Sequence, residues 1–575
     1  MARPTVTSDE RIDDIPLLIY WLQQMHIDTI IDAVLGPPHG NWQGLSYGQV
    51  ALVFIAYVLT ECNHFLSPVQ DWVSDHRLCL SHALGCPVRD TDFTDDRLEI
   101  LLDHLGESEE IGAQIEAQMG QHIIRAYELP TDTARIDATR VSVYHQPKEG
   151  ETLLRFGWNK DKRPGQRQFV ELLGTLDPAG VPLCSQTTGG QCADDPLYLP
   201  AWRRMVKVLG RTDFLVVGDC KLASIENRAR IQDGGGWYLA PLPMTGNTPD
   251  DLRRWVFAPP VPPAAIRLPT QEEDEADLGQ GFEVLQTRTW TDPQTQREVK
   301  WDERVLVLQS AKLAASQRKG LAQRLARAEA ALQKLKVKAD DDLDSLTEKT
   351  EAILKQHKVS PYLEVAWTAQ VTEHKRYLKR GRHGPNSPFE MVETTTWVRT
   401  ITRQEAAIEE FNTLAGWRLY VANAPLRRLD TTGIVICYRQ QWQPERGFHR
   451  LKNAAMAVLP LLLRSDERIR GLLLLLVIAL RAFTLFEFVA RRSLAQQSEP
   501  LRGLYAGNPK RATTRPTAER LIKAFDKLTL YRLTDGDDIW YEVTPLSDLQ
   551  KRILDLVGVP ESVYADLTNP LLDDT

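Results

Sequence analysis

The segment from 133 to 241 carries a strand pattern that few folds satisfy. Three successive stretches alternate in polarity or are rich in β-branched residues: 133–146 (TARIDATRVSVYHQ), 167–177 (RQFVELLGTLD) and 181–189 (VPLCSQTTG). An amphipathic stretch, YLPAWRRMVKVL, then leads into the buried-strand pattern FLVVG, a second helical stretch and a last strand in WYLAP. A strand–helix–strand unit after three adjoining strands predicts a mixed α/β sheet. Functional groups in such sheets gather at the carboxyl ends of parallel strands.

Helical patterns lie on both sides of this segment. Residues 15–120 place apolar residues at intervals of three and four, and 434–492 do the same around a leucine-rich run. Between them, 258–269 is a proline-rich connector, TDPQTQ (291–296) marks a hairpin, and 311–355 is a long charged helical stretch. The a and d positions of its heptad pattern are Leu321, Leu325, Ala328, Leu332 and Leu335. The pattern loses register near 339–342, which favours an intramolecular helical hairpin over a dimerisation zipper.

These patterns predict an α/β protein of five parts. They are an all-α N-terminal domain (1–125), the first part of the core (126–245), an insertion with strands and a helical hairpin (246–425), the second part of the core (426–495) and a C-terminal tail (496–575). A chain of 575 residues is too long for one ordinary core.

Composition narrows the setting of the protein. The seven cysteines are scattered without a CxxC pair, which indicates a reducing compartment. The run LLLLLVIAL (472–480) is far shorter than the roughly 20 residues that span a bilayer, so we expect a buried helix, no membrane partner and a cytoplasmic location. The net charge of −8 argues against a nucleic-acid partner, but the charge is segregated: HKRYLKRGRH (374–383) has five Lys/Arg and no acid.

Three acidic residues have distinctive local settings. Asp137 lies in the first strand pattern, Asp219 directly follows the FLVVG strand, and Glu445 lies in the helical stretch ICYRQQWQPERGFHRLKNA. Carboxylates that converge from distant positions can hold two hard divalent cations for phosphodiester chemistry. Each alone has an ordinary alternative, such as a cap, an ion pair with a neighbouring arginine, or a surface position.

The setting of Glu445 follows helical spacing. Tyr438, Gln441, Glu445 and Lys452 are separated by three, four and seven residues, which places them on one face of a continuous helix. Pro444 opposes that continuity, because it would kink the helix or begin a new one. In the second case Tyr438 and Gln441 lie on the approach to the helix.

In this order and spacing the residues resemble those of the insertion-sequence DDE transposases of bacteria. The resemblance is to the group with a Tyr-x2-Arg-x3-Glu-x6-Lys signature and a β-rich insertion before the glutamate helix, and it spans roughly residues 10–490. It implies an RNase H-like core and a catalytic, metal-binding triad of Asp137, Asp219 and Glu445 with two Mg²⁺ ions, Mn²⁺ being a possible substitute. Gln441 departs from the pattern, which has arginine there.

The resemblance also implies DNA contacts. Tyr438 and Lys452 match contacts to the phosphate of the transposon end, and Trp442 matches a residue that stacks an extruded base, although a core position is its alternative. Arg439 and Arg446 are candidates to replace the charge missing at Gln441. A basic turn could follow the DNA backbone through Lys160, Lys162, Arg163 and Arg167. A solvent-exposed turn without a DNA contact explains these residues equally well.

The function expected from this resemblance is cleavage of double-stranded DNA at transposon ends and strand transfer into target DNA, by a homodimer in the synaptic complex. The enzyme would be cytoplasmic, and associated with the nucleoid when bound. The alternatives are an RNase H-like nuclease without strand transfer, a catalytically impaired DNA-binding derivative, and a helical scaffold. A zinc site at His76, Cys79, His82 and Cys86 is disfavoured, since these residues fall in an apolar helical pattern.

Overall fold

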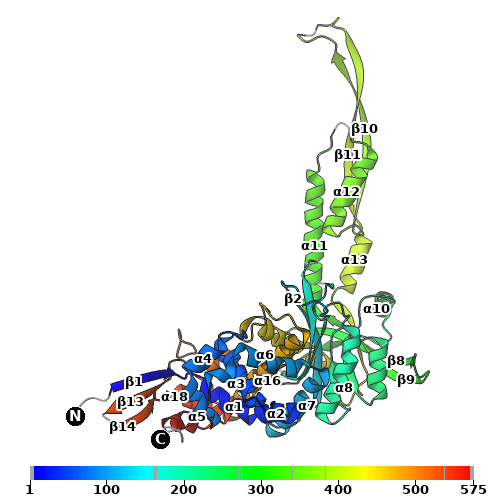
Figure 1. Cartoon of the computed structure of the whole chain (residues 1–575). Helices are drawn as coiled ribbons and strands as arrows, with labels where there is room; N and C mark the ends of the chain where they lie inside the picture. The colour runs from blue at the N-terminus through cyan, green and yellow to red at the C-terminus, as the bar shows by residue number, and fades with distance from the viewer. Residues whose placement is uncertain are drawn as a thin grey trace.

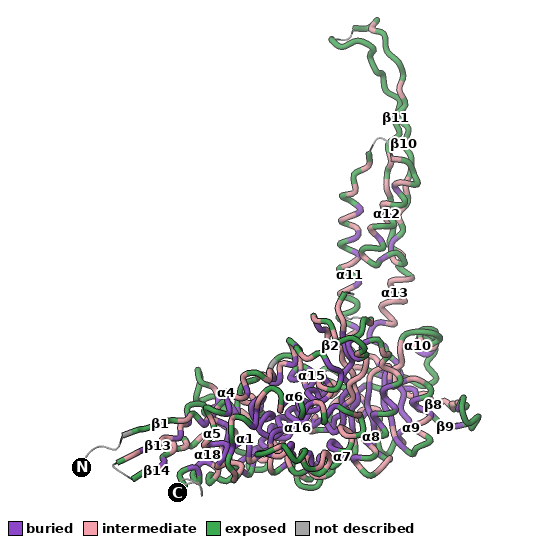
Figure 2. Tube along the Cα trace, viewed as in Figure 1, coloured by how far each residue is buried: buried purple, intermediate pink, exposed green. Residues whose placement is uncertain are grey.

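The computed structural model describes residues 5–158, 165–269, 271–272, 275–338, 341–382, 384–535 and 538–569. The chain forms an elongated body, from which a narrow arm projects (Figure 1). Buried residues concentrate in the body and along the lower part of the arm (Figure 2).

The centre of the body is a nine-stranded mixed sheet. Its order is β4-β3-β2-β5-β6-β12-β9-β8-β7. Strand β5 pairs in parallel with β2 on one side and with β6 on the other, and every other pairing is antiparallel. The strands are β2 (Thr133–Val143), β3 (Arg167–Leu176), β4 (Val181–Gly189), β5 (Leu215–Val217), β6 (Trp237–Pro241), β7 (Ala264–Ile266), β8 (Gly279–Thr291), β9 (Glu298–Ser310) and β12 (Trp417–Ala422). The predicted mixed sheet and its three adjoining strands are confirmed.

Helices cover both faces of this sheet. On one face, α8 (Tyr198–Leu209) and α9 (Ile225–Asp233) pack over β2–β6, and Val216 of β5 joins their apolar cluster. The opposite face of β5 presents Leu215 and Val217 to Ile434 of α14 (Thr431–Arg439). The alternation of side chains along a strand therefore assigns each residue near the end of β5 to a known face.

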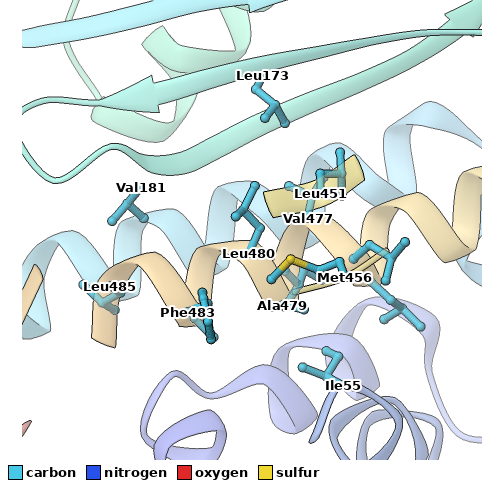
Figure 3. Packing of buried hydrophobic residues seen from close by; sticks show 14 of the residues in the cluster. Ile55, Leu173, Val181, Leu451, Met456, Val477, Ala479, Leu480, Phe483 and Leu485 are labelled. Carbon is cyan, nitrogen blue, oxygen red and sulfur yellow. The ribbon is translucent and has the colours of Figure 1, made fainter. Parts of the chain in front are cut away.

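The N-terminal helices share their core with the sheet. They are α1 (Ile15–Gln24), α2 (Ile27–Leu35), α3 (Tyr47–Glu61), α4 (Val69–Asp75), α5 (Arg77–Leu84), α6 (Asp95–Gly106) and α7 (Glu109–Ala126). The 32-residue helix α16 (Asp466–Gln497) packs against α3 and β4, and Figure 3 shows it lying between Ile55 of α3 and Leu173 of β3. A Cβ atom on Gly106 would lie 1.8 Å from the Glu467 carbonyl oxygen, so glycine permits the close crossing of α6 and α16.

Helix α16 contains the leucine-rich run. By length and composition it is the one helix of the described chain that could cross a membrane, and 94% of its most apolar window is buried by the rest of the protein. The predicted buried core helix is confirmed, because its apolar surface is covered on all sides by protein.

The prediction that residues 1–125 are all helical is wrong at their start. Strand β1 (Thr5–Arg11) pairs with β13 (Thr529–Asp535), which pairs with β14 (Asp538–Val543). The polar segment TVTSDER carries no apolar alternation, and its pairing partner lies more than 500 residues away. The tail continues into α17 (Ala518–Lys523), α18 (Asp548–Val557) and α19 (Ser562–Ala565), which pack on the N-terminal region and α16.

The predicted insertion is divided between the sheet and the arm. Its strands β7, β8, β9 and β12 extend the central sheet, and α10 (Thr248–Phe257) lies beside them. The arm consists of α11 (Ala311–Lys334), α12 (Leu343–His357), a ribbon of β10 (Leu363–Tyr377) and β11 (Phe389–Arg403), and α13 (Glu405–Leu414) (Figure 1). The helical hairpin is confirmed, and the buried face of α11 consists of Ala314, Leu321, Leu325, Ala328 and Leu332.

Candidate active site

Asp137 lies within β2, and Asp219 lies two residues after the end of the neighbouring parallel strand β5. The register of β2 and β5 pairs Arg135 with Val217, so each aspartate follows a member of this last register pair by two residues. Asp137 shares the face of β2 that α14 covers, since Arg135 donates a 2.7 Å hydrogen bond to a carbonyl of that helix. The structure therefore brings these two predicted residues together.

Tyr198 ties the two aspartates into one site. Its hydroxyl donates a 2.6 Å hydrogen bond to Oδ1 of Asp219, which also accepts from the Lys221 backbone N–H at 2.8 Å. Burial raises the pKa of Tyr198 well above its ordinary value, and the charges of Asp219 and then Asp137 raise it further. The charges of both carboxylates thus act on the same phenol, with Asp137 inside β2 and Asp219 just past the carboxyl end of β5, the end of a strand where ligands bind in open α/β sheets.

The glutamate segment is not one continuous helix. Helix α14 ends at Arg439, α15 (Trp442–His449) begins two residues before Pro444, and Arg450–Ala454 form a π-helical turn. The expectation that Tyr438, Gln441, Glu445 and Lys452 share one uninterrupted helical face is therefore wrong. A proline in the first turn costs no intrahelical hydrogen bond, which is why the new helix begins there.

Strand β2 and the glutamate segment are joined at two points. Arg135 donates from Nη1 to Oε1 of Gln441 at 3.1 Å. Lys452 donates from Nζ to Oγ1 of Thr139 at 2.6 Å and to the carbonyl of the next residue at 2.7 Å. Arg135, Asp137 and Thr139 alternate along one face of β2, so the two contacts flank Asp137.

Glu445 lies between these contacts on its own segment. From Gln441 to Glu445 the helix advances about 6 Å, and from Arg135 to Asp137 the strand advances about 7 Å, so the carboxylates reach a similar level. Helix α15 also lies against the sheet at this level: a Cβ on Gly447 would lie 3.8 Å from Leu173, the register partner of Asp137. Glu445 itself is exposed in the first turn of α15.

The donor chemistry of the three residues suits a hard divalent cation, since all three offer carboxylate oxygens. Asp137 lies on β2, Asp219 lies just past the end of the adjacent β5, and the helix of Glu445 is held to β2 by the contacts of Gln441 and Lys452. As positioned, no three His, Cys, Asp or Glu side chains within the described ranges gather closely enough to hold a metal ion. His76, Cys79, His82 and Cys86, the residues of the disfavoured zinc pattern, do not form such a group either.

Tyr438 and Arg439 line a cleft whose described lining residues do not include Asp137, Asp219 or Glu445. Burial raises the pKa of Tyr438, with smaller contributions from Tyr420 and Asp219, and the two tyrosine rings are 4.9 Å apart. The cleft has a volume of about 390 Å³ and is also lined by Arg418 and Lys312. Trp442 is 51% exposed, so the alternative of a core position is wrong for this side chain.

Gln441 takes part in the internal support of the helix. Its Oε1 accepts from the fully buried Arg135, whose guanidinium also binds Asp177 through two atoms at 2.6 and 2.8 Å. Its Nε2 is buried without a hydrogen-bond partner in the described structure. Arg446 forms a two-point ion pair with Glu487 at 2.5 and 2.7 Å, which fixes its guanidinium against α16.

The basic turn lies mostly outside the described residues. This applies to Lys160, Lys162 and Arg163, while Arg167 donates to the Gln146 side chain at 2.9 Å and stacks on Phe156. Their predicted DNA contacts stay predictions.

Sequence reasoning missed three residues that organise this site: Tyr198, Arg135 and Asp177. Tyr198 looks like one more apolar position of an amphipathic helix, and Arg135 looks like a surface residue of a strand. The one available signal for Arg135 was its position two residues before Asp137, which puts both on one face of β2.

A mixed α/β sheet with one aspartate inside a central strand, a second just past the end of the next strand, and a glutamate helix fastened to the first of these strands is an arrangement suited to metal-assisted phosphoryl chemistry. A family model of the transposase DDE domain matches residues 130–481, which is more than half of the chain. The chain belongs to this transposase family.

Two further comparisons add little. No curated protein matches the chain. Among solved structures, it is similar to the piggyBac transposase in a cryo-EM structure of a synaptic complex with hairpin DNA. The TM-score is 0.35 and the identity 9%, over 100% of this chain and 88% of that one, which is too weak a likeness to support a conclusion.

Proposed function

We propose that this protein is an active DDE transposase that cuts double-stranded DNA at transposon ends and joins the freed 3′-hydroxyls to target DNA. The observation that carries the proposal is the fastening of the Glu445 helix to β2 on both sides of Asp137, beside Asp219, in a chain of the transposase family. We further propose that it works as a cytoplasmic homodimer on two DNA ends, with the RNase H-like core that the central strand order β3-β2-β5-β6 favours.

Asp137, Asp219 and Glu445 would hold the divalent ions, with Mg²⁺ the expected metal and Mn²⁺ a substitute. Bound ions of this kind activate the attacking oxygen and stabilise the leaving one. Holding them requires Glu445 to approach the two aspartates, and the contacts at Gln441 and Lys452 keep its helix within reach.

The other residues position the DNA and the carboxylates. Tyr198 holds Asp219 in one orientation through its 2.6 Å hydrogen bond. Arg439 and Tyr438 offer a cation and a hydroxyl donor to a phosphate in the cleft that they line, and exposed Trp442 offers a stacking surface. Lys452 bonds to β2 here, so its proposed phosphate contact requires the side chain to exchange that hydrogen bond for DNA.

The catalytically impaired alternative is disfavoured by the role of Gln441. The substitution of the family's arginine is matched by a buried arginine on β2, so it does not leave the glutamate helix unsupported. The nuclease alternative differs from the proposal only in lacking strand transfer.

The test uses a plasmid carrying the DNA that flanks the gene. We expect Asp137→Asn, Asp219→Asn and Glu445→Gln each to abolish Mg²⁺-dependent cleavage while duplex binding persists. Glu409→Gln, an exposed acid on α13, is the matched control and should cleave normally. Cleavage that survives all three site substitutions would refute the proposal, and cleavage without joined products would favour the nuclease.

A further inference from the structure

The arm carries a charge opposite to that of the whole chain. Residues 311–414, from α11 to α13, contain 18 Lys/Arg and 14 Asp/Glu, whereas the chain has a net charge of −8. Local charge of this kind, and not the total, determines binding to a polyanion. The arm is therefore the part of the molecule best suited to a phosphate backbone far from the candidate active site.

The cations of α11 form a straight line. Lys312, Lys319, Arg327 and Lys334 are exposed and separated by seven, eight and seven residues, which places them on one side of the helix. This basic ridge is opposite the buried face of α11 by helical geometry. It extends for about 33 Å, close to one turn of B-DNA.

The basic ridge begins at the cleft that Tyr438 and Arg439 line. Lys312, its first residue, lines the same cleft as Arg418, Tyr438 and Arg439. DNA phosphates held in this cleft would thus meet a row of cations that leads outward along the arm.

The far end of the arm is a ribbon with no protein on either face. All residues from 368 to 382 are exposed, and the apolar side chains of Leu378, Phe389 and Met391 are 61, 43 and 52% exposed. A two-stranded ribbon is marginal on its own, and its width fits the major groove of DNA. The ribbon tip, defined here as 374–382, has five cations: Lys375, Arg376, Lys379, Arg380 and Arg382.

The tip cations have few protein partners. Arg376 lies 3.6 Å from Glu390, and Lys375 stacks 4.4 Å from the Phe389 ring centroid. No ion pair in the described part of the chain involves Lys379, Arg380 or Arg382. Charge complementarity therefore favours nucleic acid as the occupant over a second copy of this net-acidic chain.

We propose that the arm is a second DNA-binding surface: the basic ridge follows the backbone of the duplex held at the candidate active site, and the ribbon tip enters a groove of that duplex further out. This inference rests on the proposed function. The seven ribbon pairs from Val371–Thr395 to Tyr377–Phe389 add about 23 Å to the length of the basic ridge. The proposed contacts therefore extend on the order of 15–20 base pairs from the cleft.

The ridge is tested by removing two cations in the full-length protein. Lys319→Gln with Arg327→Gln is compared with Lys355→Gln with Lys358→Gln, which removes the same charge from exposed positions at the end of α12. For two lost phosphate contacts, the slope of log K against log salt should fall by about 1.8 in the ridge variant and not in the control. Binding is measured on a duplex of about 40 base pairs, taken from the DNA that flanks the gene and long enough to reach past the proposed contacts.

The tip is tested by shortening the ribbon. Replacing 372–394 with Asn-Gly joins Val371 to Thr395, which are register partners, through a two-residue turn. Hydroxyl-radical footprinting should lose the protection furthest from the cleavage point and keep the protection next to it.

The outcomes separate this inference from the proposed function. If the wild-type protein cleaves DNA but the ridge variant keeps the full salt slope and the short ribbon keeps the outer footprint, the arm inference is overturned and the transposase proposal stands. A change of oligomeric state in these variants at constant salt slope overturns it in favour of a second copy on the arm. Failure of the wild-type protein to bind or cut duplex DNA refutes both.

Discussion

Arg135 offers the sharpest test of how this site is built. It is fully buried on β2, ion-paired with Asp177, and its guanidinium donates to Gln441 and to the Cys437 carbonyl at 3.1 and 2.7 Å. Burial raises the pKa of Asp177 while the hydrogen bonds and charge of Arg135 lower it. We expect Arg135→Met to leave a buried carboxylate unpaired and to lower the free energy of unfolding by about 3–5 kcal/mol.

The double variant Arg135→Met with Asp177→Asn removes that stranded charge. Most of the lost stability should return, and the unpaired Gln441 and Cys437 groups should leave a deficit of about 1–3 kcal/mol. Cleavage should not return, because the junction of α14 and α15 has lost its fastening to β2. A misplacement of Glu445 by about 1 Å is worth on the order of 100-fold in rate.

The assay pairs thermal unfolding with single-turnover cleavage at a temperature where every variant is folded. Asp177→Asn alone is the control: it also disturbs the buried pair but keeps the bonds from Arg135 to α14 and Gln441, so its cleavage rate should stay near that of the wild type. A double variant that regains both stability and cleavage would show that Arg135 only stabilises the fold, and the positioning argument would be wrong.

Three shorter predictions follow. Tyr198→Phe removes a 2.6 Å donor from Asp219, and the Mg²⁺ concentration for half-maximal cleavage should rise by about tenfold or more; an unchanged midpoint would contradict the role of the phenol. Gln441→Arg should lower the melting temperature without raising activity, since it sets a second guanidinium beside Arg135; faster cleavage would show that the charge missing at position 441 impairs the enzyme. Burial raises the pKa of Glu171 from 4.5 to about 8, which is on the order of 5 kcal/mol, so its contribution to stability is full below pH 4.5 and is lost as the pH rises to about 8. Glu171→Gln should therefore match the wild type in urea unfolding near pH 4.5 and be more stable above pH 8, and equal stabilities at pH 9 would count against a buried charge.

The sheet was predictable from sequence because its signal is local. Strands β2 to β6 and helices α8 and α9 each carry their own hydrophobic period, and the carboxylates stand at positions that the strands define. Strand β1 and its tail partner carry no such signal, since both are short and pair across almost the whole chain. Strand β11 was missed for a related reason: with both faces exposed, it has no core to impose an apolar alternation.

The candidate site likewise has parts that a local sequence pattern predicts and parts that it does not. Asp137 and Asp219 follow from strand positions, but the break at Gln441 depends on where helix α15 begins, and the proline indicated only that some break was needed. The bond from Arg135 to Gln441 joins residues 306 positions apart, so no local pattern reveals it.

That bond changes the meaning of the departure at Gln441. An arginine at 441 would place a cation where Arg135 already fills the space next to Asp177, and two buried guanidinium groups against one carboxylate would cost free energy. The neutral amide avoids this repulsion and still accepts a hydrogen bond from the strand that carries Asp137. On the proposed function, the charge that a phosphate needs would then come from Arg439 and Lys312 around the cleft, which are not among the four signature positions. The structure fastens the helix from β2, and the proposal has the arm contribute to holding the phosphate.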